Sequence, residues 1–153
     1  MKAFTIEHVN WRHSKRRLKR LRDRVFVCEW RIPRQSEFNE QDQKSDHVLI
    51  IDADGSDIAT GRITPEGEIG RIAVVSHCRG KEIYDVLYNA LLDIAKSKEL
   101  NNVYVQCELN GVDHFQEQGF QTVGGVYMDS GIPRQKMSCP INDFSWSRVE
   151  LTH

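Results

Sequence analysis

With 153 residues, the chain is long enough to bury one hydrophobic core and too short for two ordinary domains. Its 39% hydrophobic and 28% charged residues fit a soluble globular protein, and no apolar run is long enough for a membrane span. The first ten residues lack the apolar segment of a signal peptide, and the four cysteines are too widely spaced for a zinc site or a disulfide framework. We therefore expect a cytoplasmic protein that needs no metal and no membrane.

The formal net charge of −1 hides an uneven distribution. Eight lysines and arginines and a single aspartate lie between Arg12 and Arg24, so the rest of the chain is acidic. Such a basic segment can bind phosphate groups or nucleic acid. No aromatic residue is interspersed among the basic ones, however, and the solvated outer face of one helix is the simpler explanation. Nucleic acid is therefore not the expected partner.

The predicted elements begin with a strand over residues 3–9. A helix follows from about residue 14 to residue 30, because apolar residues recur on one face at spacings of three and four: Leu18, Leu21, Val25 and Cys28. Residues 31–46 are polar and contain Pro33, which predicts a loop with room for one short turn of helix.

A meander of three strands is predicted next, over residues 47–53, 58–64 and 69–75. Asp54-Gly55 is a typical hairpin turn between the first two of these strands. The strongest helix pattern of the chain then covers residues 81–99, where apolar residues repeat at i, i+3, i+4 and i+7.

In the last part of the chain, a strand is predicted over Asn102–Glu108 and a short helix over residues 112–118. A terminal pair of strands follows, over Gln121–Asp129 and residues 134–137. The order of all elements predicts the α/β (α+β) class. We expect one mixed, mostly antiparallel central sheet that is flanked by helices on both faces.

Residues 68–87 contain a strand that ends before Arg79-Gly80 and a helix that follows it. The first turn of such a helix favours an anion, because its N–H groups lack helical partners and the helix dipole is positive there. A phosphate-binding loop at this place normally contains glycines, which let the backbone approach the ligand. Glu82 and Tyr84 occupy those positions, so the architecture favours an anion site and the two side chains oppose it.

Several short motifs occur in a fixed order around this segment. They are Val25-Phe26-Val27 with Glu29, Asp42 with His47, Ala59-Thr60-Gly61-Arg62, Ile69-Gly70-Arg71, Arg79-Gly80, Gly119-Phe120, and Gly125 with Tyr127, Asp129 and Gly131-Ile132-Pro133. Together with the element order, they resemble the GNAT superfamily of acyl-CoA-dependent N-acetyltransferases, and within it the ElaA-like branch. The resemblance covers about residues 1–138, an acetyltransferase-like domain, and leaves 139–153 as a C-terminal tail to which the sequence assigns no role.

The resemblance implies a GNAT-like fold in which the central strand and the next strand diverge, so that the pantetheine arm of acetyl-CoA pairs with exposed backbone between them. By the same resemblance, Ile72, Ala73 and Val74 would bind that arm. The residues expected around the pyrophosphate are Arg79, Gly80, Lys81, Glu82, Ile83 and Tyr84. The implied reaction transfers an acetyl group from acetyl-CoA, as cosubstrate, to a small-molecule or peptide amine that attacks the thioester directly.

Three candidate catalytic residues follow from this resemblance. Glu29 would be the general base or bind the acceptor ammonium, unless it only pairs with a nearby arginine. His47 opens a strand beside it and serves either acid–base chemistry or packing. Arg71 alternates with apolar neighbours on the central strand, so it points either into the cleft or toward an ion pair with Glu68.

The chain departs from the family pattern at the cofactor side. Both glycines of the family loop are replaced, by Glu82 and Tyr84. Phe115 stands where many members have a tyrosine that can protonate the leaving thiolate. Tyr127 either replaces that hydroxyl or is an ordinary aromatic residue of a strand, and the second role is the simpler one. Glu108 replaces a common amide. Two functions therefore stay open: an N-acetyltransferase, or a degenerate member with weak or no acetyl-CoA binding that acts as a small-molecule or protein-binding module. A homodimer is left open as well.

Overall fold

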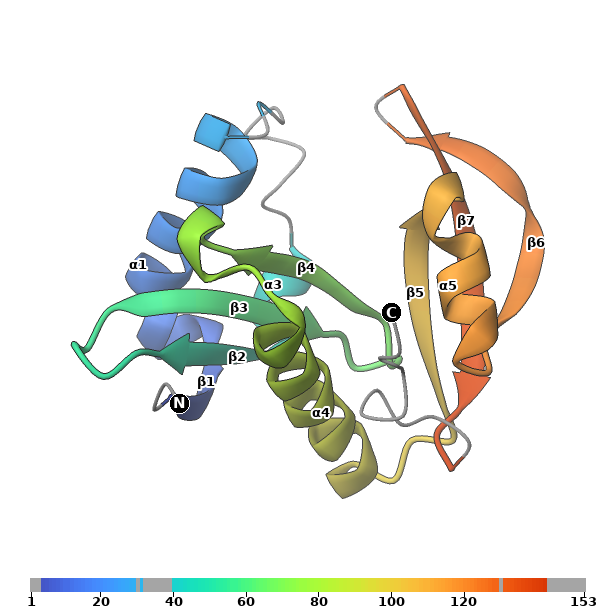
Figure 1. Ribbon diagram of the computed structural model, residues 1–153. Helices are drawn as coiled ribbons and strands as arrows, with labels where there is room; N and C mark the ends of the chain where they lie inside the picture. Colours follow the sequence, from blue (N-terminus) through green and yellow to red (C-terminus); the bar gives the residue numbers. More distant parts are fainter. Residues whose placement is uncertain (1–3, 30, 32–39, 130, 143–153) are drawn as a thin grey trace.

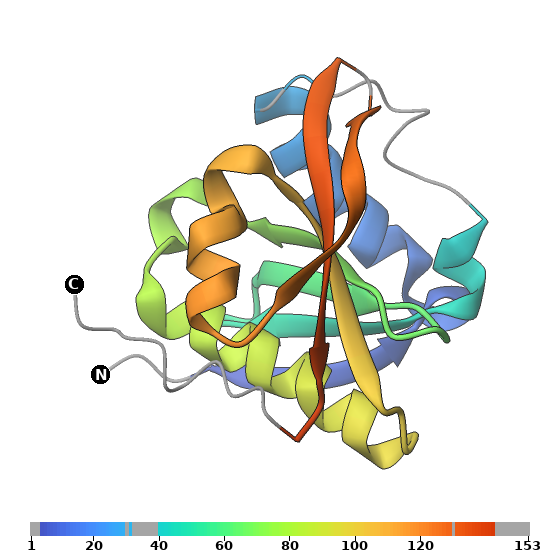
Figure 2. The ribbon, with the colours of Figure 1, turned by 90° about the vertical axis from the view of Figure 1, so that its right-hand side faces the viewer.

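The computed structural model describes residues 4–29, 31, 40–129 and 131–142, and within them the chain forms two sheets (Figure 1). The larger sheet has the order β1-β2-β3-β4, with β1 (Thr5–Asn10), β2 (Asp46–Ile51), β3 (Asp57–Ile63) and β4 (Ile69–Val74). The smaller sheet has the order β5-β7-β6, with β5 (Asn102–Glu108), β6 (Gln121–Asp129) and β7 (Ile132–Pro140). The strands of the smaller sheet run across those of the larger one (Figure 2). The predicted fold class and element order are confirmed.

Helix α1 (Trp11–Arg22) starts earlier than predicted and continues into a π-helical segment, η1 (Asp23–Glu29). The early start has a local cause. The side chain of Asn10 accepts a hydrogen bond of 2.9 Å from the backbone N–H of His13, which caps the first turn.

The π-helical segment corrects one sequence prediction. Cys28 was predicted on the buried face of this helix with Val25, but its side chain is exposed. Because π-helical hydrogen bonds join residues i and i+5, the apolar face shifts along the chain within η1. Val25 and Phe26 are therefore buried side by side, and Cys28 turns toward solvent.

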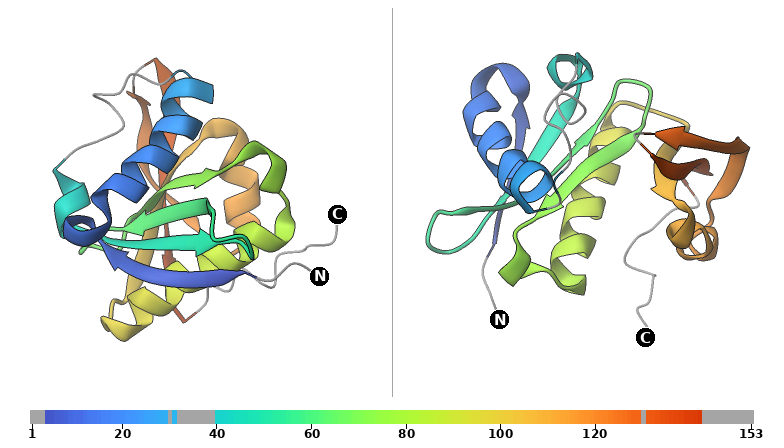
Figure 3. Two further views of the ribbon diagram at one scale, coloured as in Figure 1. Left: turned by 90° about the vertical axis from the view of Figure 1, so that its left-hand side faces the viewer. Right: turned by 90° about the horizontal axis from the view of Figure 1, so that it is seen from above.

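Helices α1 and α4 (Lys81–Ser97) cover opposite faces of the larger sheet (Figure 3). On α4, the predicted apolar stripe is buried against that sheet, as its inward residues show: Ile83, Leu87, Leu91, Ile94 and Ala95. Short segments complete the framework: α3 (Gln41–Lys44), η2 (Ser76–Cys78), η3 (Leu109–Gly111) and α5 (Val112–Glu117).

The two sheets meet at a single bridge between β4 and β5 within the described residues. Glu68 and Tyr104 form this parallel bridge, and the backbone N–H of Tyr104 donates to the carbonyl of Gly67 over 2.9 Å. Beyond this point β4 and β5 diverge, as Figure 1 shows. The expected divergence of the central strand from the next one is therefore present.

Strand β7 is longer at both ends than the predicted segment 134–137. Cys139 is fully buried and lies opposite Val103 of β5. The N–H of Ile141 then donates to the carbonyl of Asn101 over 2.9 Å. The smaller sheet thus continues past residue 138, the expected end of the acetyltransferase-like domain.

Gly67 makes the junction between the sheets sensitive to substitution. Its φ is +101°, and a Cβ at this position would lie 2.7 Å from the carbonyl oxygen of Asn102. We expect Gly67→Ala to lower the free energy of unfolding by about 2–4 kcal/mol in urea titrations, through backbone strain and this clash. Gly55→Ala is the matched control, because Gly55 also has a positive φ (+86°) but no atom lies within 4 Å of the added Cβ. Equal losses in the two variants would show that the clash is unimportant.

Candidate active site

The divergence of β4 and β5 opens a cavity of about 820 Å³. Its lining residues come from η1, α3, β3, β4 and α4 and from β5, α5, β6 and β7. Six charged residues line it: Arg62, Glu68, Arg71, Glu108, Asp129 and Arg134. Charges of both signs therefore surround a space between the two sheets.

Arg71 lies at a break in the pairing of β3 with β4. Thr60 pairs with Ala73 and Arg62 with Gly70, so two residues of β4 lie opposite Gly61 alone. The φ of Arg71 is +51°, in the left-handed region that non-glycine residues rarely adopt. This β-bulge brings Arg71 to the cavity wall, which is one of the two positions that the sequence left open for it.

One edge of β4 is paired with β3, and the other faces the gap. Ala73 and Val74 pair with β3 on one edge of the strand. On the other edge, no described strand pairs with β4 beyond the bridge at Glu68. Alternate N–H and C=O groups between residues 69 and 74 therefore face the gap. Ile72 lines the cavity, whereas the side chains of Ala73 and Val74 are buried in the core.

The expected pyrophosphate loop fits less well. The Nε of Arg79 donates to the carbonyl of Val74 over 3.0 Å, so its guanidinium folds back onto the end of β4. Ile83 is buried in the core and Tyr84 is half-buried against it. Glu82 is exposed in the first turn of α4. Gly80 has open space around it, and the side chain of Lys81 lies outside the described residues.

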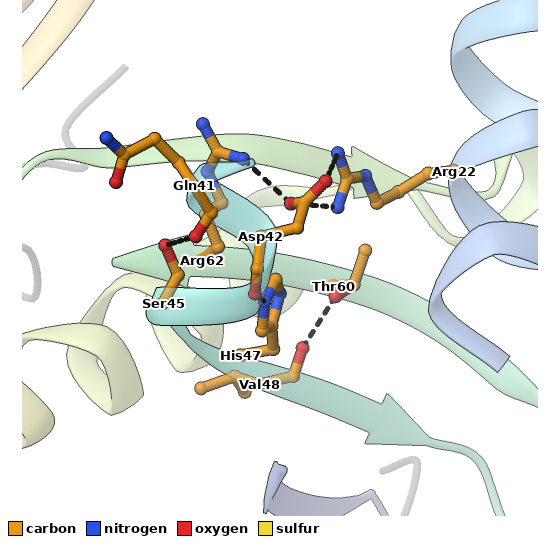
Figure 4. A network of polar contacts seen from close by, with 8 residues as sticks. All are labelled: Arg22, Gln41, Asp42, Ser45, His47, Val48, Thr60 and Arg62. Atoms are coloured by element: carbon orange, nitrogen blue, oxygen red, sulfur yellow. Dashed lines mark hydrogen bonds and ion pairs between the residues drawn. The ribbon is translucent and has the colours of Figure 1, made fainter. Parts of the chain in front are cut away.

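A buried charge cluster lies next to the cavity (Figure 4). Asp42 accepts hydrogen bonds from the Nη1 of Arg22 and the Nη1 of Arg62, each over 2.7 Å, and a longer one of 3.3 Å from Arg22 Nη2. Burial alone would raise the pKa of the Asp42 carboxyl, but the two guanidinium groups outweigh it and hold that pKa below its usual value. The carboxyl of Asp42 is therefore ionised at neutral pH, and it joins the end of α1 to β3.

His47 lies in the same layer, away from the cavity. It is 1% exposed, and its ring centroid is 5.5 Å from that of Trp11. Its Nε2 lies 2.9 Å from the backbone carbonyl of Asp42, which fixes the ring by a hydrogen bond. Burial lowers the pKa of His47, so the ring is neutral. Among the two roles considered for His47, this position favours packing.

Glu29 is the last residue of η1, and its carboxylate is not part of the described structure. Phe26, earlier in the same segment, lines the cavity together with Gln41. Part of η1 therefore borders the cavity, and the role of Glu29 stays a prediction.

The far wall contains a polar network that the sequence analysis did not assemble. The amide of Gln106 donates to Glu68 Oε1 over 3.1 Å, and the hydroxyl of Tyr127 donates to Gln106 Oε1. Arg134 Nη1 donates to the Gln106 carbonyl over 3.3 Å, and its Nε pairs with Asp129 Oδ2 at 3.2 Å. Glu68, which directly precedes β4, meets residues of β5, β6 and β7 here, and the strand pairing brings them together.

Two tyrosines line the cavity beside Phe115, which has no hydroxyl. Burial raises the pKa of Tyr127 and, more strongly, that of Tyr88 on α4. Tyr88 was absent from the sequence prediction, because its spacing on α4 is that of a core residue. Cys107 also lines the cavity, and burial raises the pKa of its thiol, which argues against a nucleophilic role.

Within the described part of the chain, no group of three His, Cys, Asp or Glu side chains could hold a metal ion. No described helix is long and apolar enough to cross a membrane.

Comparison with known proteins agrees with this geometry. Residues 24–141 match the family model of the acetyltransferase (GNAT) domain. The chain therefore belongs to the GNAT acetyltransferase family, which confirms the resemblance seen in the sequence.

The chain is also similar to individual acetyltransferases, in sequence and in structure. The chain is 23% identical to the uncharacterized N-acetyltransferase YjcF of Bacillus subtilis (strain 168) over 76% of this chain and 86% of the relative. It is similar in structure to ElaA of Escherichia coli, with a TM-score of 0.74 and 25% identity over 91% of this chain and 99% of ElaA. An acyl-CoA N-acyltransferase from Pseudomonas aeruginosa has the same fold, with a TM-score of 0.77, 24% identity and the same coverage of both chains.

The buried cluster predicts a large cost for removing the charge of Asp42. We expect Asp42→Asn to lower the free energy of unfolding by about 3–5 kcal/mol, because two buried guanidinium groups lose their carboxylate. Asp57→Asn is the control: Asp57 pairs with Arg17 at 2.7 Å, but the two side chains are 23% and 40% exposed. Its loss should stay below about 1 kcal/mol. Urea titrations of both variants test this, and similar losses would contradict the buried role of Asp42.

The buried neutral His47 predicts acid sensitivity. Its folded-state pKa is lowered from 6.5, so the folded protein takes up this proton only at lower pH than the unfolded chain does. The stabilisation is complete above pH 6.5 and is lost as the pH falls below this value toward and through the folded-state pKa, with a slope of at most about 1.4 kcal/mol per unit. In urea titrations we expect this contribution to be constant from pH 8 to 6.5 and to fall from pH 6.5 to 5, in the wild type and in the exposed control His13→Gln. His47→Gln should lack it, and a slope unchanged in that variant would refute the assignment.

Proposed function

We propose that the protein is an N-acetyltransferase that transfers an acetyl group from acetyl-CoA to an amine. The observation that carries this proposal is the gap between β4 and β5, which combines an unpaired strand edge, a bulge at Arg71 and an adjoining polar cavity. The strand edge suits the amide groups of pantetheine, and the cavity has room for an acceptor. Membership of the GNAT family supports the same function.

In the proposed reaction, the uncharged amine attacks the thioester carbon, a C–N bond forms, and the C–S bond breaks. The ammonium form of the acceptor must first lose a proton. Glu68, which lines the cavity, is the base that we propose among the described residues, acting directly or through water. Glu29, the last residue of η1, stays the base that the resemblance implies. Backbone N–H groups of β4 stabilise the oxyanion.

The CoA thiol has an ordinary pKa of about 8.5, so the thiolate leaves without a strong acid. This explains how Phe115 is tolerated at the position of the usual tyrosine. Tyr88 and Tyr127 both line the cavity and are the hydroxyl groups nearest to this role among the described residues, although burial raises the pKa of each.

Glu82 is proposed to weaken acetyl-CoA binding without preventing it, since its side chain is exposed and can turn into solvent. A carboxylate at about 4 Å from a phosphate charge costs about 1 kcal/mol in water. We therefore expect Glu82→Gln to tighten acetyl-CoA binding by about fivefold in calorimetric titrations at low salt, and by less as salt is added.

Glu66→Gln is the control, because Glu66 is exposed in the turn before β4, away from the loop. It removes the same charge and should leave the affinity unchanged. No heat with millimolar acetyl-CoA in the wild type or in Glu82→Gln would refute the proposed function and favour the degenerate binding module.

A further inference from the structure

The outer face of α1 is strongly basic. The helix covers one face of the larger sheet, and its apolar side packs into the core, where Trp11, Leu18 and Leu21 are at most 7% exposed (Figure 3). The opposite side of α1 and the start of η1 carry a row of exposed lysines and arginines. We call this row the basic stripe: Arg12, Lys15, Arg16, Lys19, Arg20 and Arg24. On α1 these residues share one face because positions three and four apart are neighbours on a helix surface.

Most of the basic stripe has no partner among the described residues. At its border, Arg17 binds Asp57 over 2.7 Å and Glu7 over 3.1 Å. Lys19 and Asp23 have further interactions within the protein. Five members take part in no ion pair or side-chain hydrogen bond of the described structure: Arg12, Lys15, Arg16, Arg20 and Arg24.

Nearby carboxylates do not cancel this charge. Glu7 and Asp57 pair with Arg17, and Asp23 lies within the same segment of the chain. Of the eight lysines and arginines between residues 12 and 24, only Arg22 is buried. Seven positive charges therefore stand against three negative ones, a net charge of +4. A solvated face, the simpler explanation from the sequence, accounts for the exposure of these side chains and leaves their lack of carboxylate partners unexplained.

The shape and chemistry of the basic stripe favour a regular polyanion. Arg12, Arg16 and Arg20 follow one another at intervals of about 6 Å along the helix axis. Guanidinium groups bind phosphates with paired hydrogen bonds. The stripe contains no Phe, Tyr or Trp on which the bases of a single strand could stack. The apolar side of α1 lies in the core, so the helix cannot enter a lipid surface in the way an amphipathic membrane helix does.

We propose that the basic stripe binds the phosphate backbone of double-stranded DNA, independently of base sequence. The major groove of B-form DNA is about 12 Å wide and admits an α-helix, whereas that of A-form RNA is too narrow for side chains to read. Each cation that neutralises a phosphate releases a condensed counterion, which favours binding at low salt. No member of the stripe lines the cavity, so this binding needs no acetyl-CoA and is separate from the proposed acetyl transfer.

The test measures binding of the full chain to a short fluorescein-labelled DNA duplex by fluorescence anisotropy, without acetyl-CoA. If about four phosphates are neutralised, the logarithm of the association constant falls against the logarithm of the salt concentration with a slope of about −3.6. The affinity should then drop about 150-fold between about 50 and 200 mM salt.

The double variant Arg16→Gln/Arg20→Gln removes two adjacent members of the stripe. We expect it to bind the duplex at least about tenfold more weakly at low salt and to reduce the salt slope by about 1.8. Lys44→Gln/Lys96→Gln is the matched control, because it removes two exposed charges from α3 and α4 and should leave both quantities unchanged.

Parallel titrations with an RNA duplex, single-stranded DNA, poly-glutamate and vesicles of anionic lipid identify the partner. Binding to any of these as tight as to the DNA duplex would overturn the inference. So would an affinity that survives in Arg16→Gln/Arg20→Gln, an affinity that does not depend on salt, or no binding at low salt with about 100 μM protein. Each of these outcomes leaves the proposed acetyl transfer intact, since no variant here changes a residue of the cavity.

Discussion

The separation of β4 from β5 after a single bridge is the constraint on which the site depends. Glu68 and Tyr104 hold the two strands together at one end, and Gly67 lets the backbones approach there. If β4 and β5 continued to pair, the backbone groups on this edge of β4 would form hydrogen bonds with β5, and side chains would fill the cavity. The junction therefore sets both where the gap begins and which residues of β4 face it.

A second constraint fixes the opposite border of the cavity. Asp42 comes from a four-residue helix, which has too few internal hydrogen bonds to be stable alone. Its contacts with Arg22 and Arg62 attach that helix to α1 and β3, and the His47 ring closes the layer beneath it. Charge pairing thus attaches α3 to the wall that carries Arg62, whereas β3 itself is held by strand pairing and by the apolar core under α4.

The sequence predicted most of the framework, because local patterns determine it. Strand β5 was predicted with its observed bounds, and the stripe on α4 faces the core as its periodicity indicated. Cys28 was misplaced, since periodicity assumes a regular α-helix and η1 is wider. At the site, Arg71 lines the cavity, one of the two positions that the sequence left open for it. The network of Glu68, Gln106 and Tyr127 was not predicted, because it depends on how β5, β6 and β7 pair across long separations in the chain.

The bulge at Arg71 also bears on how this protein balances stability against function. A residue other than glycine in the left-handed region costs about 1–2 kcal/mol relative to an ordinary strand conformation. That cost recurs in every folded molecule, whether or not a ligand is bound, and glycine would avoid it. The backbone here is therefore held under strain to keep a long cationic side chain at the mouth of the gap, and stability alone does not account for an arginine at this position.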